Sequence, residues 1–108
     1  MLYDGALKNI AAGKAAMERA DTFRQNESLL KAQKIVAELI SCLDMDKGGE
    51  IAQNLLALYS FCYNKLVEAN IGDTTEGLDH ATEVLRDLRS GWVELEQSLR
   101  IQGADAAA

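Results

Sequence analysis

The sequence predicts an all-α fold, an antiparallel up-down-up-down four-helix bundle. Four segments carry apolar residues at the three- and four-residue steps of amphipathic helices, and no segment alternates at period two over the length of a strand. Proline is absent, so no residue of this type interrupts a long helix. Because short connections make neighbouring helices antiparallel, we expect one bundle domain over residues 1–102 and a disordered C-terminal tail over residues 103–108.

The first two helices each show one apolar seam. The first seam is rich in small residues, which let a neighbouring helix approach closely, and consists of Tyr3, Ala6, Ile10, Gly13, Met17 and Ala20. The second helix begins near residues 22–26, and its seam consists of Leu29, Ala32, Val36, Leu39 or Ile40, and Leu43. Gly48 and Gly49 follow, and we expect them to supply the positive φ angles of a tight corner.

The third and fourth helices complete the bundle. The third is expected from about Glu50 to Asn70, closed by Gly72, with Asp73 or Thr74 as the next N-cap. The fourth is expected to reach about residue 100, and its heptad-like seam consists of Ala81, Leu85, Leu88, Trp92, Leu95 and Leu99.

The third helix is more apolar than one core contact requires. A first stripe, predicted to be core, consists of Ile51, Leu55, Leu58, Cys62, Leu66 and Ala69. A second stripe beside it consists of Ala52, Leu56, Tyr59, Tyr63 and Val67. Either neighbouring helices cover both stripes, or the second stripe lines an exposed groove for an apolar partner helix. The groove interpretation predicts that Tyr59 and Val67 are partly exposed and that Leu58 is buried.

Charge and the single histidine exclude several classes of function. The formal net charge is -6 and the basic residues are spread along the chain, which argues against nucleic acid as a partner. His80 is the only histidine, so histidine-centred triads and two-histidine metal sites are excluded, and its position predicts an exposed side chain. We therefore expect no catalysis and no cofactor.

The acidic corner Asp44, Asp46 and Glu50 begins like an EF-hand loop. The match ends there, because Gly48 stands at the third liganding position and Leu55 at the position of the bidentate glutamate. We interpret these carboxylates as charges at helix ends and expect no metal.

The cysteines and the apolar runs indicate a cellular compartment. Cys42 and Cys62 lie on or beside helical seams, which predicts reduced, buried thiols. No apolar run approaches the roughly 18 residues of a transmembrane helix, and the N-terminus lacks the pattern of a signal peptide. We therefore expect a cytoplasmic protein without membrane insertion.

Several phrases of the sequence match one family in order and spacing. They are residues 1–6, residues 41–55 and the run from Leu58 to Asn70, with a weaker continuation over residues 85–92. Over nearly its whole length the chain thereby resembles the flagellar export chaperone family FliS. The resemblance implies a cytoplasmic helical bundle that binds the C-terminal segment of flagellin, blocks premature polymerisation and presents the subunit to the flagellar type III export gate.

The resemblance also implies where the partner binds. The groove residues carried over from it lie in the matched stretch of the third helix and are Ile51, Ala52, Leu55, Tyr59 and Val67. Periodicity alone adds Leu56 and Tyr63. A component of the export gate and a co-chaperone are further partners to consider.

Two expectations concern self-association. Family members normally carry a further N-terminal stretch that can cover part of the binding surface, so its absence here is expected to leave apolar surface open and to favour a homodimer. The alternative function is a homo-oligomeric structural or adaptor protein that pairs through the exposed apolar face of the third helix.

Overall fold

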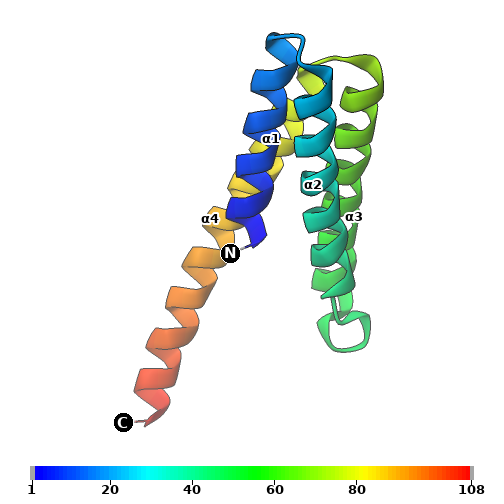
Figure 1. Ribbon diagram of the computed structural model, residues 1–108. Helices are drawn as coiled ribbons and strands as arrows, with labels where there is room; N and C mark the ends of the chain where they lie inside the picture. The colour runs from blue at the N-terminus through cyan, green and yellow to red at the C-terminus, as the bar shows by residue number, and fades with distance from the viewer. Residues whose placement is uncertain (1, 108) are drawn as a thin grey trace.

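The described chain folds as four helices joined by short turns: α1 (Leu2–Glu18), α2 (Thr22–Ser41), α3 (Met45–Gly72) and α4 (Glu76–Ala107). This computed structural model describes the backbone of residues 2–107 and the side chains of residues 2–91. Successive helices run in opposite directions, and each packs against its neighbours in the sequence while α1 also packs against α4 (Figure 1). The predicted all-α class and the four-helix arrangement are confirmed.

Some sequence predictions fall outside the described side chains. They concern Trp92, Leu95 and Leu99 of the fourth seam and the tail of residues 103–108. This part of the seam, the tail and the domain boundary at residue 102 stay predictions.

Aspartates cap three of the helix ends. Asp21 accepts a hydrogen bond from the backbone N–H of Arg24 at the start of α2, and Asp44 does the same for two N–H groups at the start of α3. Asp73 ends α3 in the left-handed conformation, with φ 52°. The sequence predicts Gly72 for this end and Asp73 or Thr74 as the next N-cap. Aspartate tolerates positive φ, and its carboxylate here accepts a hydrogen bond from Gln25 at 2.8 Å.

The corner before α3 turns at Gly49. This residue has φ 54° and ψ -127°, which are not helical angles, so it kinks α3. A short helical piece from Met45 precedes the kink, and the long continuous part of α3 starts after Gly49, near Glu50 as the sequence predicted. The prediction of positive φ at this corner is confirmed for Gly49 and is wrong for Gly48. The kink redirects the chain so that residues after it run antiparallel to α2.

Gly49→Ala is expected to destabilise the protein by about 1–3 kcal/mol, because a side chain strains the backbone at this φ and ψ. A Cβ atom at this position meets no atom within 4 Å, so the effect is conformational rather than steric. Gly91→Ala is the matched control, since Gly91 lies inside α4 and its Cβ would also be free of contacts. The control should be neutral or stabilising by up to about 1 kcal/mol. Urea unfolding of the two variants measures the difference, and equal midpoints would contradict the assigned conformation.

The core lies where all four helices meet. In α1 and α2 the buried residues follow the predicted seams: Tyr3, Ala6, Ile10 and Gly13 in one helix, and Leu29, Ala32, Val36 and Leu39 in the other. Gly13 allows the closest approach, because a Cβ there would lie 2.5 Å from a methyl carbon of Leu29. Leu78, Ala81 and Leu85 complete the core from α4.

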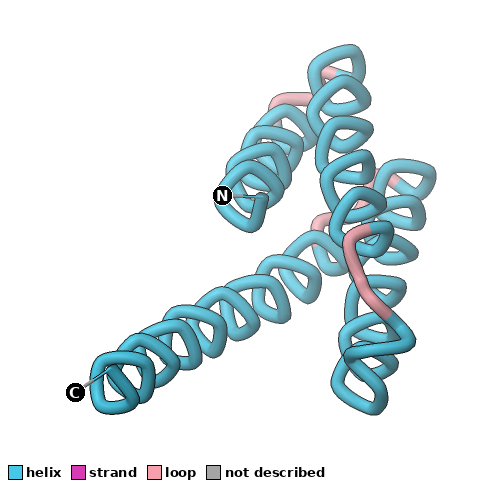
Figure 2. The backbone as a smooth tube through the Cα atoms, turned by 90° about the horizontal axis from the view of Figure 1, so that it is seen from below, coloured by secondary structure: helices cyan, strands magenta, loops and turns pink. Residues whose placement is uncertain are grey.

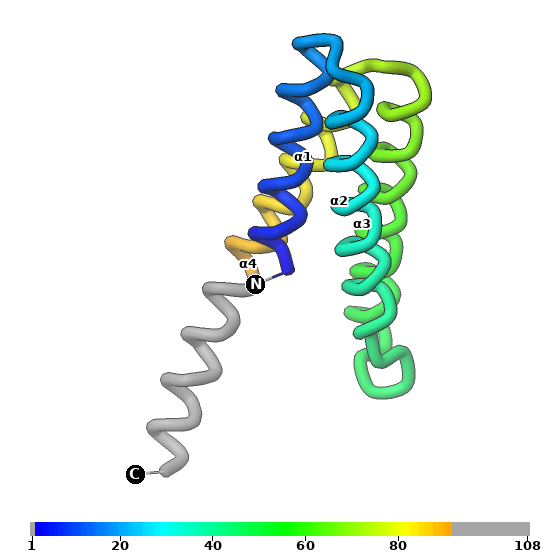
Figure 3. Tube along the Cα trace, viewed as in Figure 1, coloured from blue at the N-terminus to red at the C-terminus, as the bar shows by residue number. Residues whose placement is uncertain are grey.

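The helices separate towards one end of the bundle, which we call the base. The base contains the N-terminus of α1, the C-terminus of α2 and the N-terminus of α3 (Figure 1). Seen from below, α4 and α3 diverge from each other in this direction (Figure 2), and the divergence is already evident in the part of α4 before residue 92 (Figure 3). In the part of α3 near the base, Ile51 and Leu58 are exposed.

Candidate partner-binding groove

An open groove of about 520 Å³ lies at the base of the bundle, and we call it the basal groove. Its walls come from three helices, the first turn of α1, the end of α2 and the N-terminal half of α3. The lining residues are Tyr3, Leu39, Cys42, Leu43, Asp44, Lys47, Gly48, Ile51, Ala52, Leu55 and Tyr59. Most of them are apolar, so the groove suits an apolar ligand surface.

Two tyrosines join α1 to α3 in the wall of the basal groove. The hydroxyl groups of Tyr3 and Tyr59 are hydrogen-bonded to each other, and their ring centroids lie 6.3 Å apart with a tilt of 49°. Both residues are buried, with Tyr59 only 3% exposed. A hydrogen-bonded, packed pair of this kind makes a rigid wall rather than an adaptable one.

The polar rim of the groove is set by the α2–α3 turn. One carboxylate oxygen of Asp44 accepts hydrogen bonds from the backbone N–H groups of Asp46 and Lys47, at 3.1 and 3.0 Å. Gly48, just before the kink of α3, lies so close to the turn after the kink that a Cβ there would be 2.6 Å from the Cβ of Ala52. The chain thus folds tightly at the kink, and Asp44 and Lys47 line the groove beside its apolar residues.

Four of the seven predicted binding residues line the basal groove: Ile51, Ala52, Leu55 and Tyr59. Ile51 is the most accessible of them, at 69% exposed, whereas Ala52 is buried and Leu55 is half-buried. The other three, Leu56, Tyr63 and Val67, are half-buried and do not line this groove. The structure therefore divides the predicted set between two surfaces of α3.

The two stripes of α3 are rotated relative to the prediction. Tyr59 was expected to be exposed and Leu58 buried, and both expectations are wrong, since Leu58 is 38% exposed. Val67 is partly exposed, as predicted, and Cys62 and Leu66 are buried, as predicted. The reason is that Tyr59 belongs to the buried core cluster, where its hydroxyl is hydrogen-bonded to that of Tyr3 in α1, whereas Leu58 does not belong to that cluster.

Predictions for three polar side chains had mixed outcomes. Cys42 was expected to be buried and is exposed, because it lies just past the end of α2 where the groove opens. Cys62 is buried as expected, and burial raises the pKa of its thiol to about 11. His80 is exposed, as predicted.

Sequence reasoning missed the half of the groove that comes from α1 and α2. Tyr3, Leu39 and Leu43 were assigned to helical seams but not to a binding surface. Periodicity treats each helix separately and cannot show which seam ends meet in space. The family resemblance could have pointed to Tyr3 and Leu43, because both lie in the matched phrases at residues 1–6 and 41–55.

Two further grooves differ from the basal groove in their chemistry. One, of about 450 Å³, lies between α2 and α3, where Leu30, Ala37 and Tyr63 are flanked by Lys31 and Lys34.

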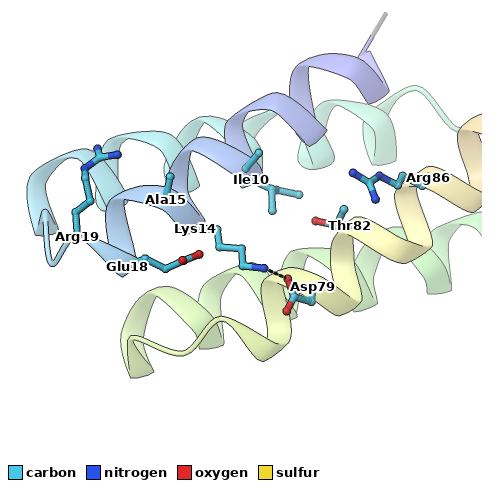
Figure 4. A pocket seen from close by; sticks show the side chains of 9 residues that line it. Ile10, Lys14, Ala15, Glu18, Arg19, Asp79, Thr82 and Arg86 are labelled. Atoms are coloured by element: carbon cyan, nitrogen blue, oxygen red, sulfur yellow. Dashed lines mark hydrogen bonds and ion pairs between the residues drawn. The ribbon is translucent and has the colours of Figure 1, made fainter.

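The other groove, of about 580 Å³, lies between α1 and α4 and is lined largely by charged side chains (Figure 4). Lys14 donates to Asp79 at 2.7 Å across it, and this hydrogen bond raises the pKa of Lys14. An apolar partner helix would have to cover these charges, which disfavours this groove as its site.

Two features of the described residues bear on other functions. Among them, no group of three or more histidine, cysteine, aspartate or glutamate side chains is placed to hold a metal ion. No helix in the described part of the chain combines the length and hydropathy needed to span a membrane.

Comparison with known proteins identifies the family. The model of the family "Flagellar protein FliS" matches residues 1–99. The flagellar secretion chaperone FliS of Vibrio cholerae is 39% identical over 88% of this chain and 70% of its own length. The proteins of the same name from Bacillus subtilis and Salmonella typhimurium are 38% and 30% identical, over 93% and 94% of this chain and 74% and 76% of theirs. The chain therefore belongs to the FliS family of flagellar proteins.

Proposed function

We propose that this protein is a cytoplasmic flagellar export chaperone that holds an apolar helix from the C-terminal segment of flagellin in the basal groove. In this role it prevents premature polymerisation and delivers flagellin to the type III export apparatus. The observation that carries the proposal is the exposure of Ile51 in a groove whose other lining residues are largely apolar. The names of the relatives support a chaperone role, and no catalytic step is part of it.

The shape of the basal groove suits a helix rather than an extended strand. Its walls are helix faces, and the described residues around it offer no sheet edge to which a strand could add. A groove of about 520 Å³ has the size of a small-ligand site and accepts a few large side chains. A partner helix would supply them from one apolar stripe, at the i, i+3 or i+4, and i+7 positions.

The composition of the groove also fits reversible binding. Fully burying an isoleucine side chain contributes about 1.5–3 kcal/mol, and Ile51 is already partly covered in the free chain. Leu55 and Cys42 would contribute less, since one is half-buried and the other is small. A chaperone that must release its cargo at the export apparatus needs such a modest set of contacts. The apolar face of the flagellin helix that the groove would cover is otherwise buried only in the filament.

Titration of the chain with a peptide of the flagellin C-terminal segment tests the proposal. We expect saturable binding with one peptide per chain and a negative heat-capacity change, which marks the burial of apolar surface. A peptide of the same composition in scrambled order, which loses the apolar stripe, should bind much more weakly. Equal affinity for both peptides, or no binding of either, would refute the function.

One observation favours a second candidate function, a homo-oligomer that pairs through α3. Leu58 and Phe61 are 38% and 39% exposed and lie with Ile51 on one apolar face of α3. The ammonium group of Lys65 lies 5.5 Å from the Phe61 ring centroid. Light scattering separates the candidates: a dimer that persists when the flagellin peptide is added favours self-pairing, and a monomer that binds the peptide favours the chaperone.

A further inference from the structure

We propose that Arg89 of α4 is a positioning residue for partner binding, because its ion pair with Asp4 holds the first turn of α1 in place as a wall of the basal groove. This inference rests on the function proposed above and deepens it, since it names a residue outside the groove that sets the affinity for the partner helix. Arg89 does not line the groove and acts through Asp4 and the neighbouring Tyr3.

The first turn of α1 is the part of the groove wall that most needs support from other helices. The helix begins at Leu2, and Tyr3 lines the groove from within the first turn. The first four N–H groups of an α-helix have no partner within the helix, and helix ends fray. The position of Tyr3 in the wall therefore depends on the contacts that this turn makes with the rest of the bundle.

Three consecutive residues fasten this turn to three different helices. The hydroxyl group of Tyr3 is hydrogen-bonded to that of the groove tyrosine in α3. The Nε atom of Arg89 in α4 lies 3.1 Å from Oδ1 of Asp4. Gly5 packs so closely against α2 that a Cβ there would lie 3.2 Å from Cδ1 of Ile35. Successive side chains of an α-helix point about 100° apart, so the turn is held from three sides.

The contact with α4 is the one that is open to water. The side chains of Asp4 and Arg89 are 49% and 50% exposed, whereas Tyr3 is buried. An exposed ion pair contributes modestly to stability and is screened by salt. Its removal would free the α4 side of the turn and leave the other two contacts in place. The expected effect is therefore a change in affinity without unfolding.

A second ion pair between the same two helices offers a matched control. The Nζ atom of Lys14 lies 2.7 Å from Oδ1 of Asp79, and these side chains are 38% and 54% exposed (Figure 4). Lys14 is as far along α1 from Asp4 as Asp79 is back along α4 from Arg89. Both pairs therefore obey one antiparallel register, about 15 Å apart. Lys14 and Asp79 join α1 to α4 but do not line the basal groove.

The first turn controls the affinity because a site that is complete in only a fraction of molecules binds more weakly by that fraction. When the turn frays, Tyr3 leaves the wall and the apolar groove loses one side. The loss of an exposed ion pair shifts such an equilibrium by about two- to fivefold. Arg89 thus tunes the affinity for the partner helix without touching it.

Titration with the flagellin C-terminal peptide compares the two ion pairs. We expect Arg89→Gln to bind the peptide about two- to fivefold more weakly than the wild type, and Lys14→Gln to bind it equally well. Each substitution removes one positive charge and one ion pair between α1 and α4, so a general effect of charge or packing would weaken both. Arg89→Lys keeps a cation within reach of Asp4 and should retain most of the affinity. Wild-type affinity in Arg89→Gln, or equal losses in both glutamine variants, would overturn the proposal.

A double-mutant cycle with Asp4→Asn tests whether Arg89 acts through Asp4. Asp4→Asn alone should weaken binding at least as much as Arg89→Gln, because Asp4 also interacts favourably with the positive end of the α1 dipole. The double variant should bind no more weakly than Asp4→Asn, since the ion pair is already broken. Losses that add would mean that Arg89 touches the peptide itself, and they would overturn the positioning role.

Amide hydrogen exchange in the free protein separates this inference from the proposed function. In an α-helix the N–H group of Leu7 bonds to the carbonyl of Tyr3, so its exchange rate reports on fraying of the first turn. We expect exchange at Leu7 to be about two- to fivefold faster in Arg89→Gln and unchanged in Lys14→Gln. Unchanged exchange in Arg89→Gln would overturn the inference whatever the affinity.

The two readouts together assign any failure. If exchange at Leu7 follows the expected pattern but the wild type binds no peptide, the fastening of the turn by Arg89 stands and the proposed function fails. If the wild type binds the peptide and Arg89→Gln matches it in both exchange and affinity, the positioning role is wrong and the chaperone function stands.

Discussion

Tyr59→Asp is expected to unfold the protein or to leave it only marginally stable. Tyr59 is buried against α1, and its hydroxyl is hydrogen-bonded to that of Tyr3. An aspartate here would have to bury a carboxylate without a charged partner, which costs several kcal/mol. That is a large share of the ~5–15 kcal/mol that stabilises a domain. Circular dichroism should show a lost or strongly lowered thermal transition.

Tyr59→Phe is the control for this effect. It keeps the ring that packs against Tyr3 and removes only the hydroxyl group, so a loss of about 1 kcal/mol is expected. If Tyr59→Asp melted like the wild type, the side chain would have to be exposed in solution. The groove interpretation of the sequence, which predicts a partly exposed Tyr59, would then be correct.

Ile51→Asp is expected to weaken binding of the flagellin C-terminal peptide at least about a hundredfold, or roughly 2.7 kcal/mol. The carboxylate would be desolvated under an apolar partner helix. In the free protein it would stay in water, since Ile51 is largely exposed, and an acidic residue near the start of α3 is favourable for the helix. Normal helical circular dichroism with lost affinity in calorimetric titration is the expected combination.

Ile71→Asp is the matched control for this prediction. Ile71 lies on the same helix at the end away from the base and is 80% exposed, so the same substitution changes charge and hydropathy without touching the groove. Its peptide affinity should equal that of the wild type. Equal losses in the two variants would show that the effect is one of net charge, and wild-type affinity in Ile51→Asp would remove the groove from the binding site.

The helices were predictable because their signals are local. The seams of α1 and α2, the absence of proline and the glycine corner each follow from a few neighbouring residues. Which stripe of α3 is buried was not predictable in this way, because two apolar stripes lie side by side on this helix. Ala52 and Tyr59 are buried, whereas Ile51 and Leu58 beside them are exposed. The deciding contact, from Tyr59 to Tyr3, joins residues far apart in the sequence.

The candidate site was predictable only in part, for a related reason. The resemblance placed Ile51, Ala52 and Leu55 in a groove, and the structure brings these residues together in one. It also named Val67, which lies outside that groove. Leu39 and Cys42 belong to the same groove through the end of α2, and no pattern within a single helix connects them with α3. A groove between helices is a property of their packing, and periodicity carries little information about packing.

Isoleucine methyl spectra of the protein, recorded by NMR during titration with the flagellin C-terminal peptide, test the central claim most directly. Ile51 and Ile71 are both exposed and stand near opposite ends of α3, so they report on the basal groove and on a surface remote from it in a single experiment. The account predicts a saturable shift of the Ile51 methyl signal and an unchanged signal from Ile71. A shift at Ile71 with none at Ile51 would contradict it.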